Sequence, residues 1–279
     1  VDRVVDHLNA LDMAVGEINW LAPDKAADIT FERGQEAEAE HAAEQTLGDA
    51  AVDCFAQPLD GRRKALLLAD MDSTIIAEES LDELAGFLGL KDRIAAITAR
   101  AMAGELDFEA AVTERVGLLE GLAESAILEA VDEMTINPGA KELVATMKAN
   151  GAECYLVSGG FEHFTGAVAA QLGFDGHQGN RLEIADGKMT GRISGDIRNQ
   201  EAKLVTLKEK ASALGIDLAA TMTVGDGAND VPMLQAAGAG VAYHAKPVAA
   251  AAARFRVQHT DLSSLLFIQG YRFEDGTYR

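Results

Sequence analysis

The amino-acid sequence predicts an α/β protein: a Rossmann-like parallel sheet with an inserted helical cap, preceded by a small N-terminal α+β domain. Three observations lead to this prediction. Several apolar runs end in acidic or glycine-rich residues, helical patterns lie between these runs, and the first 60 residues show short alternating strands instead. Continuous apolar runs are typical of strands buried on both faces of a parallel sheet, and their alternation with helices implies βαβ units.

The length and the charge limit the functions that the chain can have. At roughly 100–200 residues per domain, 279 residues allow a large domain and a small one. The 24 Lys and Arg residues against 45 Asp and Glu residues give a net charge of −21 at pH 7. This balance argues against nucleic-acid and anionic-membrane partners, because both require cationic surfaces. No apolar run reaches the roughly 20 residues of a membrane-spanning helix and no signal-peptide pattern is present, so we expect a cytoplasmic protein.

Residues 1–60 are expected to form the small α+β domain. Apolar residues recur at helical spacing at its start, two segments alternate as strands do, and an acidic stretch has a helical pattern. The expected elements, in order, are a helix at 1–13, strands at 15–20 and 27–31, a helix at 35–46 and a strand at 51–56. This order lacks only an opening strand compared with a complete sandwich of this kind.

Residues 61–279 are expected to form the larger domain. Its buried strands are predicted at 64–69, 153–157 and 221–224. Ligands of parallel sheets bind beyond the carboxyl ends of the strands, so the polar residues that follow these three strands should meet at one site. The helical stretch at about 77–135 is longer than one crossover helix requires, which predicts a cap over that site.

Two aspartates follow the first of these strands. Asp70 and Asp72 flank a single residue, and two carboxylates this close repel each other unless one is protonated or a cation lies between them. Carboxylates and phosphate oxygens are ligands that Mg²⁺ prefers. An Asp-x-Asp pair alone also fits a solvated loop, but its position at the end of a buried strand favours a functional role.

The other two strand ends and one lysine add complementary groups. Ser158 and Gly159 follow the second strand, where a hydroxyl and exposed backbone N–H groups could hold phosphate oxygens, although a tight turn has the same pattern. Asp226 and Asp230 follow the third strand, and Asp230 could be a further metal ligand or orient one. Lys203, near the start of the preceding helix, would supply the cation that a phosphate site needs, although a lone helical lysine is usually solvated.

Four motifs in a fixed order give the chain a resemblance to a known family. DMDST, VSGG, Lys203 and GDGANDVPM resemble the four motifs of the haloacid dehalogenase superfamily of phosphatases, in order and in spacing. The finer pattern, with Glu79, Phe108 and Arg115 in the expected cap, is similar to the family within it that hydrolyses phosphoserine. The resemblance covers residues 64–261. The N-terminal domain looks like the ACT-like domains of many members, and an amino-acid-sensing role for it stays open.

The resemblance implies hydrolysis of O-phospho-L-serine to L-serine and phosphate, the last step of serine biosynthesis. Asp70 would attack phosphorus to form an aspartyl-phosphate. Asp72 would protonate the leaving serine oxygen and then activate the water that hydrolyses this intermediate. The resemblance also implies a Mg²⁺ ion held by the side chains of Asp70 and Asp226 and by the Asp72 carbonyl, with Asp230 in support from close by.

The resemblance further implies how the phosphate of the substrate is held. Ser158, Gly159 and Lys203 would surround it, and Asn229 would contact the phosphate or the rest of the substrate.

The amino-acid end of the substrate would meet the cap. Glu79 and Arg115 would pair with its ammonium and carboxylate groups, unless they form an ion pair within the cap or face water. Phe108 would close the pocket against water.

Two other functions stay open at this point. The chain could be a phosphatase for another small phosphorylated metabolite, in which case Glu79 and Arg115 would not set its specificity. It could also be a non-catalytic amino-acid sensor with a vestigial larger domain, but the presence of Asp70, Asp72 and Lys203 argues against that. The N-terminal domain could also pair two copies of the chain as a homodimer.

Overall fold

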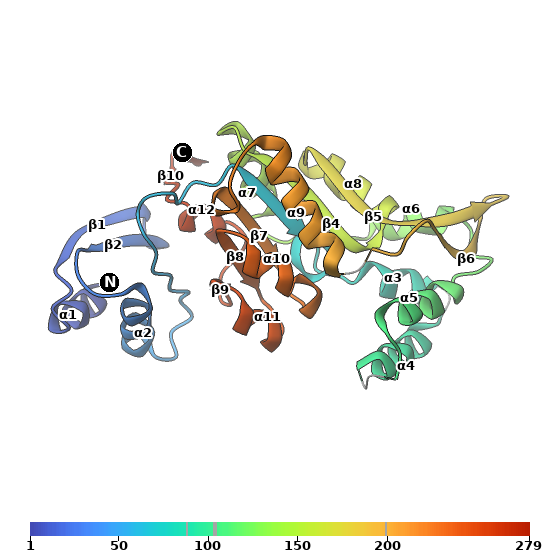
Figure 1. Ribbon diagram of the computed structural model, residues 1–279, viewed down its shortest axis with the longest axis horizontal. Helices are drawn as coiled ribbons and strands as arrows, with labels where there is room; N and C mark the ends of the chain where they lie inside the picture. The colour runs from blue at the N-terminus through green and yellow to red at the C-terminus, as the bar shows by residue number, and fades with distance from the viewer. Residues whose placement is uncertain (88, 103–104, 199) are drawn as a thin grey trace.

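The structure is a computed structural model of the chain, and it describes residues 1–87, 89–102, 105–198 and 200–279. Figure 1 shows an elongated molecule with a small N-terminal layer at one end, a central sheet with helices on both faces, and helices and a strand hairpin at the other end. None of the helices in the described ranges combines the length and the apolar character that crossing a membrane requires.

The central sheet has the strand order β6-β5-β4-β3-β7-β8-β9. Neighbouring strands from β5 to β9 pair in parallel, and only β6 is antiparallel to its partner β5. The bounds of these strands are β3 (Leu66–Asp70), β4 (Glu153–Phe161), β5 (Gly176–Ala185), β6 (Lys188–Ser194), β7 (Thr221–Gly225), β8 (Ala239–Tyr243) and β9 (Phe255–Val257).

The three predicted buried strands are β3, β4 and β7, and they lie side by side with β3 in the middle. Asp70 is opposite Val157 of β4, and Ala69 is opposite both Leu156 of β4 and Val224 of β7. Their carboxyl ends therefore meet at one edge of the sheet, which confirms the predicted α/β fold with a mostly parallel sheet.

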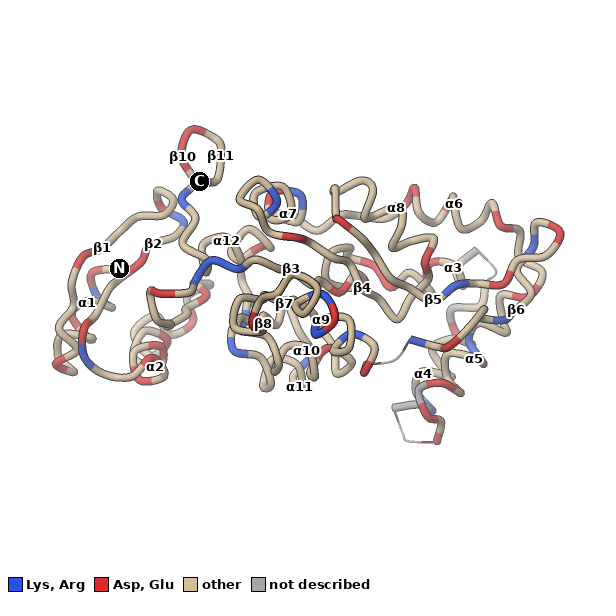
Figure 2. The backbone as a smooth tube through the Cα atoms, turned by 45° about the horizontal axis from the view of Figure 1, so that its top comes forward, with Lys and Arg blue, Asp and Glu red and all other residues tan. Residues whose placement is uncertain are grey.

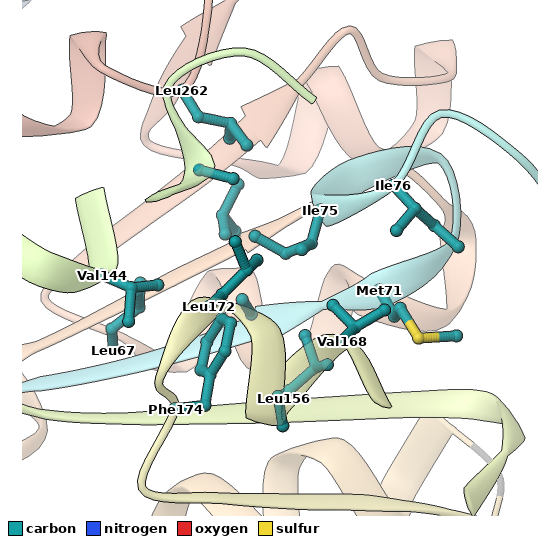
Figure 3. Packing of buried hydrophobic residues seen from close by; sticks show 14 of the residues in the cluster. Leu67, Met71, Ile75, Ile76, Val144, Leu156, Val168, Leu172, Phe174 and Leu262 are labelled. Carbon is teal, nitrogen blue, oxygen red and sulfur yellow. The ribbon is translucent and has the colours of Figure 1, made fainter. Parts of the chain in front are cut away.

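Residues 66–69 of strand β3 are apolar because the strand packs on both faces of the sheet. Leu67 belongs to the large core cluster under α7, α8 and α12, whereas Leu66 and Leu68 belong to a second cluster under α9 and α10. Figure 3 shows Leu67 close to Val144 in the first cluster. The helices that cover the two faces of the sheet have the following bounds: α7 (Ala140–Ala149), α8 (Glu162–Leu172), α9 (Gln200–Leu214), α10 (Val231–Ala236), α11 (Pro247–Ala252) and α12 (Ser264–Ile268). Two short 3-10 turns, η2 (Leu218–Ala220) and η3 (Ala228–Asp230), lie between them.

A helical insertion follows β3, as predicted for residues 77–135. The tight turn η1 (Met71–Ile75) leads into α3 (Ser80–Phe87), α4 (Lys91–Met102), α5 (Phe108–Gly117) and α6 (Ser125–Asp132). Asp107 caps α5, because its carboxylate accepts a hydrogen bond from the backbone N–H of Ala110. A bridge between Ile76 and Ile136 joins the two ends of the insertion, so the chain returns to the sheet where it left.

The N-terminal part consists of α1 (Asp2–Ala10), β1 (Val15–Ala22), β2 (Ala26–Phe31) and α2 (Glu36–Leu47). Strands β1 and β2 pair antiparallel in a two-stranded sheet, and this part has its own apolar cluster around Val4, Leu8 and Met13. At the C-terminus, β10 (Phe273–Glu274) and β11 (Thr277–Tyr278) form a short hairpin.

The predicted strand at 51–56 is wrong, because the polar groups of this segment bond elsewhere. The Asp53 carboxylate accepts hydrogen bonds from three successive backbone N–H groups, ending at Thr260, and from the Thr260 hydroxyl. The N–H of Ala56 donates to the carboxylate of Glu40. The segment therefore joins the N-terminal part to the C-terminal residues and does not extend the small sheet.

The close contact between β8 and α10 allows a test of the packing near the site. A methyl group at Gly240 would overlap the backbone carbonyl of Leu234, which cannot move aside as a side chain can. We expect Gly240→Ala to lower the free energy of unfolding by about 1–3 kcal/mol, measured in urea. Gly117→Ala is the control, because nothing lies within 4 Å of an added methyl group there. Equal effects of the two substitutions would contradict this packing.

Candidate active site

The three central strand ends open into a cavity of about 220 Å³ between the sheet and the cap. It gathers most of the predicted site residues, together with others from the cap and from two loops. Its lining consists of Asp70, Asp72, Glu79, Ser80, Leu81, Val112, Arg115, Val116, Ser158, Gly159, Gly160, Phe161, Arg198, Lys203, Asp226, Asn229 and Lys246. Asp230 is buried beside this lining. Phe108 begins α5, but its side chain lies outside the described part of the structure.

Lys203 is the buried cation of the site. Its Nζ lies 2.6 Å from Oδ1 of Asp70 and 2.6 Å from Oδ1 of Asp230. Burial acts to lower the pKa of Lys203, but the two carboxylates outweigh this effect and hold the pKa above its ordinary value. The second oxygen of Asp230 accepts hydrogen bonds from the backbone N–H groups of Asp226 and Gly227. Lys203 thus stays charged and links α9 to the ends of β3 and β7.

Three buried carboxylates form a cluster at this edge. Oxygen atoms of Asp70, Asp226 and Asp230 all lie within 4.8 Å of one another. Burial, and next to it the charge of Asp230, raises the pKa of Asp70 well above its ordinary value, although Lys203 opposes this shift. Burial also raises the pKa of Asp226. Three carboxylates this close exceed the two ammonium groups that contact them, those of Lys203 and Lys246, and their oxygens fit a hard divalent cation.

Asp72 has different surroundings from Asp70, although only one residue separates them. Its Oδ1 accepts a hydrogen bond of 2.7 Å from the backbone N–H of Ser80, and its Oδ2 accepts one of 2.7 Å from the Ser158 hydroxyl. The backbone N–H of Gly160 donates in turn to the Ser158 oxygen. Neutral donors therefore orient Asp72, whereas a buried ammonium holds Asp70, and such a difference lets two carboxylates take different chemical roles.

The cap adds two opposite charges, Glu79 and Arg115, to the lining of the cavity. Glu79 accepts a hydrogen bond of 2.9 Å from the Ser73 hydroxyl, and burial together with the charge of Asp72 raises its pKa. The Nε of Arg115 donates to the carbonyl of Ala111, and burial lowers the pKa of Arg115. The described contacts of Glu79 and Arg115 include no ion pair between them. The charges of Asp82 and Glu79 act on Arg115 in the direction opposite to burial. The cavity thus offers both a carboxylate and a guanidinium group to a ligand that carries an ammonium and a carboxylate group.

Three polar side chains of the lining were not predicted as site residues. Lys246 follows β8, and its Nζ lies 3.2 Å from Oδ2 of Asp226. The apolar run at 239–243 and the lysine after its end are a signal that could have found it. Arg198 donates to Gln178 and reaches the cavity only through tertiary contacts, so no local pattern marks it. Ser80 lines the cavity at the start of α3.

Comparisons with known proteins agree with this geometry. A family model described as haloacid dehalogenase-like hydrolase matches residues 67–235. A phosphoserine phosphatase of Streptomyces coelicolor is 43% identical over 217 residues, which are 78% of this chain and 53% of that protein. A phosphoserine phosphatase of Streptococcus thermophilus is 40% identical over 205 residues, which are 74% of this chain and 95% of that protein. The chain thus spans about half the length of the first relative and nearly all of the second.

Solved structures show the same similarity. A haloacid dehalogenase family hydrolase of Salmonella enterica serovar Typhi aligns with a TM-score of 0.81 at 34% identity, over 87% of this chain and 84% of that one. A phospho-aspartyl intermediate analogue of phosphoserine phosphatase aligns with a TM-score of 0.68 at 36% identity, over 74% of this chain and 98% of that one. The chain therefore belongs to the haloacid dehalogenase-like hydrolases, within the family of the phosphoserine phosphatases.

Proposed function

We propose that the protein hydrolyses O-phospho-L-serine to L-serine and phosphate. One observation carries the proposal: a single cavity of about 220 Å³ is lined both by the Asp70 and Lys203 pair and by the opposite charges of Glu79 and Arg115. Phosphoserine has a phosphate at one end and an ammonium and a carboxylate group at the other. The relatives and the solved structure that carry this activity in their names support the assignment.

In the first step, an oxygen of Asp70 forms a bond to phosphorus as the bond between phosphorus and the serine oxygen breaks. The electron pair of the broken bond stays on the serine oxygen, and Asp72 donates a proton to it. Asp70 suits the attack because Lys203 fixes one of its oxygens and opposes the rise in its pKa that burial causes, which favours the ionised carboxylate.

In the second step, a water molecule attacks the phosphorus of the aspartyl-phosphate. Asp72, now without its proton, accepts one from that water, and the Asp70 carboxylate leaves. The Ser158 hydroxyl, the backbone N–H of Gly159 and Lys203 would hold the phosphoryl oxygens in both steps, and their presence in the lining of the cavity supports this assignment. Asn229 also lines the cavity and would contact either the phosphate or the rest of the substrate.

We assign the cation of this site to Mg²⁺, held by the side chains of Asp70 and Asp226 and the carbonyl of Asp72, with Asp230 beside them. The buried excess of carboxylates supports this choice, and nearby phosphate oxygens are ligands that Mg²⁺ prefers. When bound, Mg²⁺ would neutralise charge on the transferring phosphoryl group.

We further propose that residues 1–60 are an ACT-like domain and that residues 61–279 are the phosphatase domain. The separate apolar cluster of the N-terminal part supports this division. Strand β1 leaves Ile18 and Trp20 exposed at 40% and 47%, which supports a homodimer formed through this domain.

Replacing the proposed nucleophile tests the reaction. Asp70→Asn should reduce phosphate release from phosphoserine by at least about a thousandfold, because an amide cannot form the acyl-phosphate bond. The release of inorganic phosphate in the presence of Mg²⁺ measures the loss. Asp24→Asn, in the exposed turn between β1 and β2, is the matched control and should retain wild-type turnover. Turnover by Asp70→Asn at the wild-type rate would rule out the proposed mechanism.

The metal assignment predicts a gain in stability that does not depend on turnover. At 100 times its dissociation constant, Mg²⁺ should stabilise the folded protein by about 2.7 kcal/mol over a sample in EDTA, which raises the melting temperature. Asp226→Asn should lose most of this gain because it removes one of the three clustered carboxylates. Asp186→Asn, in the exposed β5–β6 turn, should keep it. If Mg²⁺ raised the melting temperature of Asp226→Asn as much as that of the wild type, Asp226 would not be a ligand of the ion.

The two charges on the cap predict opposite patterns of substrate preference. Arg115→Lys should raise KM for phosphoserine by about tenfold or more, yet barely change KM for phosphoethanolamine, which has no carboxylate. Glu79→Gln should raise KM for phosphoserine, yet barely change KM for phospholactate, which has no ammonium. Steady-state kinetics with the three substrates decides between these outcomes. If both variants lose all three substrates equally, the enzyme acts on another small phosphorylated metabolite or the two residues serve only the structure of the cap.

A further inference from the structure

Ser80 combines burial, an unsatisfied hydroxyl and a place in the active-site lining. It is 1% exposed, and its Oγ has no hydrogen-bond partner in the described part of the chain. Two other buried side-chain atoms share this condition there, Oγ1 of Thr74 and Nδ1 of His163, but neither residue lines the cavity. A buried polar group without a partner costs free energy, so such a group in a native site calls for an explanation.

The hydroxyl of Ser80 faces the same small space as the carboxylate of Asp72. A methyl group built on Gly160 would lie 2.7 Å from Oγ of Ser80, 2.9 Å from Oδ2 of Asp72 and 3.0 Å from Oγ of Ser158. Three oxygen atoms therefore surround the space beside the α-carbon of Gly160. The backbone N–H of Ser80 already donates to Oδ1 of Asp72 at 2.7 Å, so the two residues are held together.

The Ser158 hydroxyl has two competing acceptors once a substrate is bound. In this structure it donates to Oδ2 of Asp72. Under the proposed function it donates to a phosphoryl oxygen, and a hydroxyl has only one hydrogen to donate. Binding of the phosphate would therefore leave Oδ2 of Asp72 without its donor at the stage when Asp72 must be held toward the leaving oxygen.

We propose that Ser80 is a positioning residue that takes over this contact. Rotation about its Cα–Cβ bond brings Oγ to the Asp72 carboxylate when the phosphate draws the Ser158 hydroxyl away. Ser80 then holds Asp72 by both its N–H and its hydroxyl, and it neither gives up nor accepts a proton in the reaction. This inference rests on the proposed function, because it assumes that a phosphate ester occupies the cavity and that Asp72 protonates the leaving oxygen.

The proposal predicts an effect that depends on the leaving group. Ser80→Ala should lower kcat/KM for phosphoserine by about fivefold or more, because the serine alkoxide cannot leave without a proton from a well-placed Asp72. It should change kcat/KM for 4-nitrophenyl phosphate less than about twofold, because nitrophenolate leaves without one. Ser80→Thr, which keeps the hydroxyl, should restore the wild-type ratio between the two substrates. Ser125→Ala, at the exposed first residue of α6, is the matched control and should change neither value.

A second measurement separates positioning from a structural role. Removal of an unpartnered hydroxyl should leave the melting temperature of the substrate-free protein unchanged or raise it. The proposal is overturned if Ser80→Ala melts at a lower temperature than the wild type, if it loses both substrates equally, or if it loses neither. Absence of wild-type turnover of phosphoserine would instead refute the proposed function. The alkyl phosphate that the wild type does cleave would then replace phosphoserine in the same comparison with 4-nitrophenyl phosphate.

Discussion

Lys203 makes two buried ion pairs, and the geometry of the site depends on them. Its Nζ is 2.6 Å from both Asp70 and Asp230, so the end of β3, the turn after β7 and the start of α9 must stay in register. Removal of Lys203 or of one of its two carboxylate partners would leave a buried charge unpaired, which is strongly destabilising. Lys203 and Lys246 together supply two positive charges against the three clustered carboxylates, and a divalent cation would neutralise the remaining negative charge.

The remaining parts of the site complement this centre. The cap adds Glu79 and Arg115 to the lining of the same cavity, and the Ser158 strand end orients Asp72. A net charge of −21 opposes the approach of a phosphorylated substrate, and Figure 2 shows acidic residues along the whole chain, including α2 and the region around β6. Lys203, Arg115 and Lys246 line the cavity together, so they counter this field where the substrate would bind.

Local sequence patterns predicted the fold and the strand-end residues of the candidate site, because strand burial and strand-end polar residues are local properties. Glu79, Arg115 and Asn229 were predicted from the family resemblance instead. The three apolar runs are the adjacent strands β3, β4 and β7, and the residues after them line one cavity. The error at 51–56 arose because a short apolar stretch does not show that Asp53 bonds to residues around Thr260. Arg198 was not predicted as a site residue for the same reason, because only the folded chain brings it to the cavity.

The central claim is that the phosphoryl group passes through Asp70, and chemical trapping tests it most directly. The enzyme would be mixed with phosphoserine and Mg²⁺, quenched in turnover and reduced with borohydride, which converts an aspartyl-phosphate to homoserine. Peptide mass spectrometry then locates the change. The account predicts homoserine at position 70, and none in enzyme mixed with serine alone. A phosphorylated intermediate at another residue, or turnover with unmodified Asp70 throughout, would contradict it.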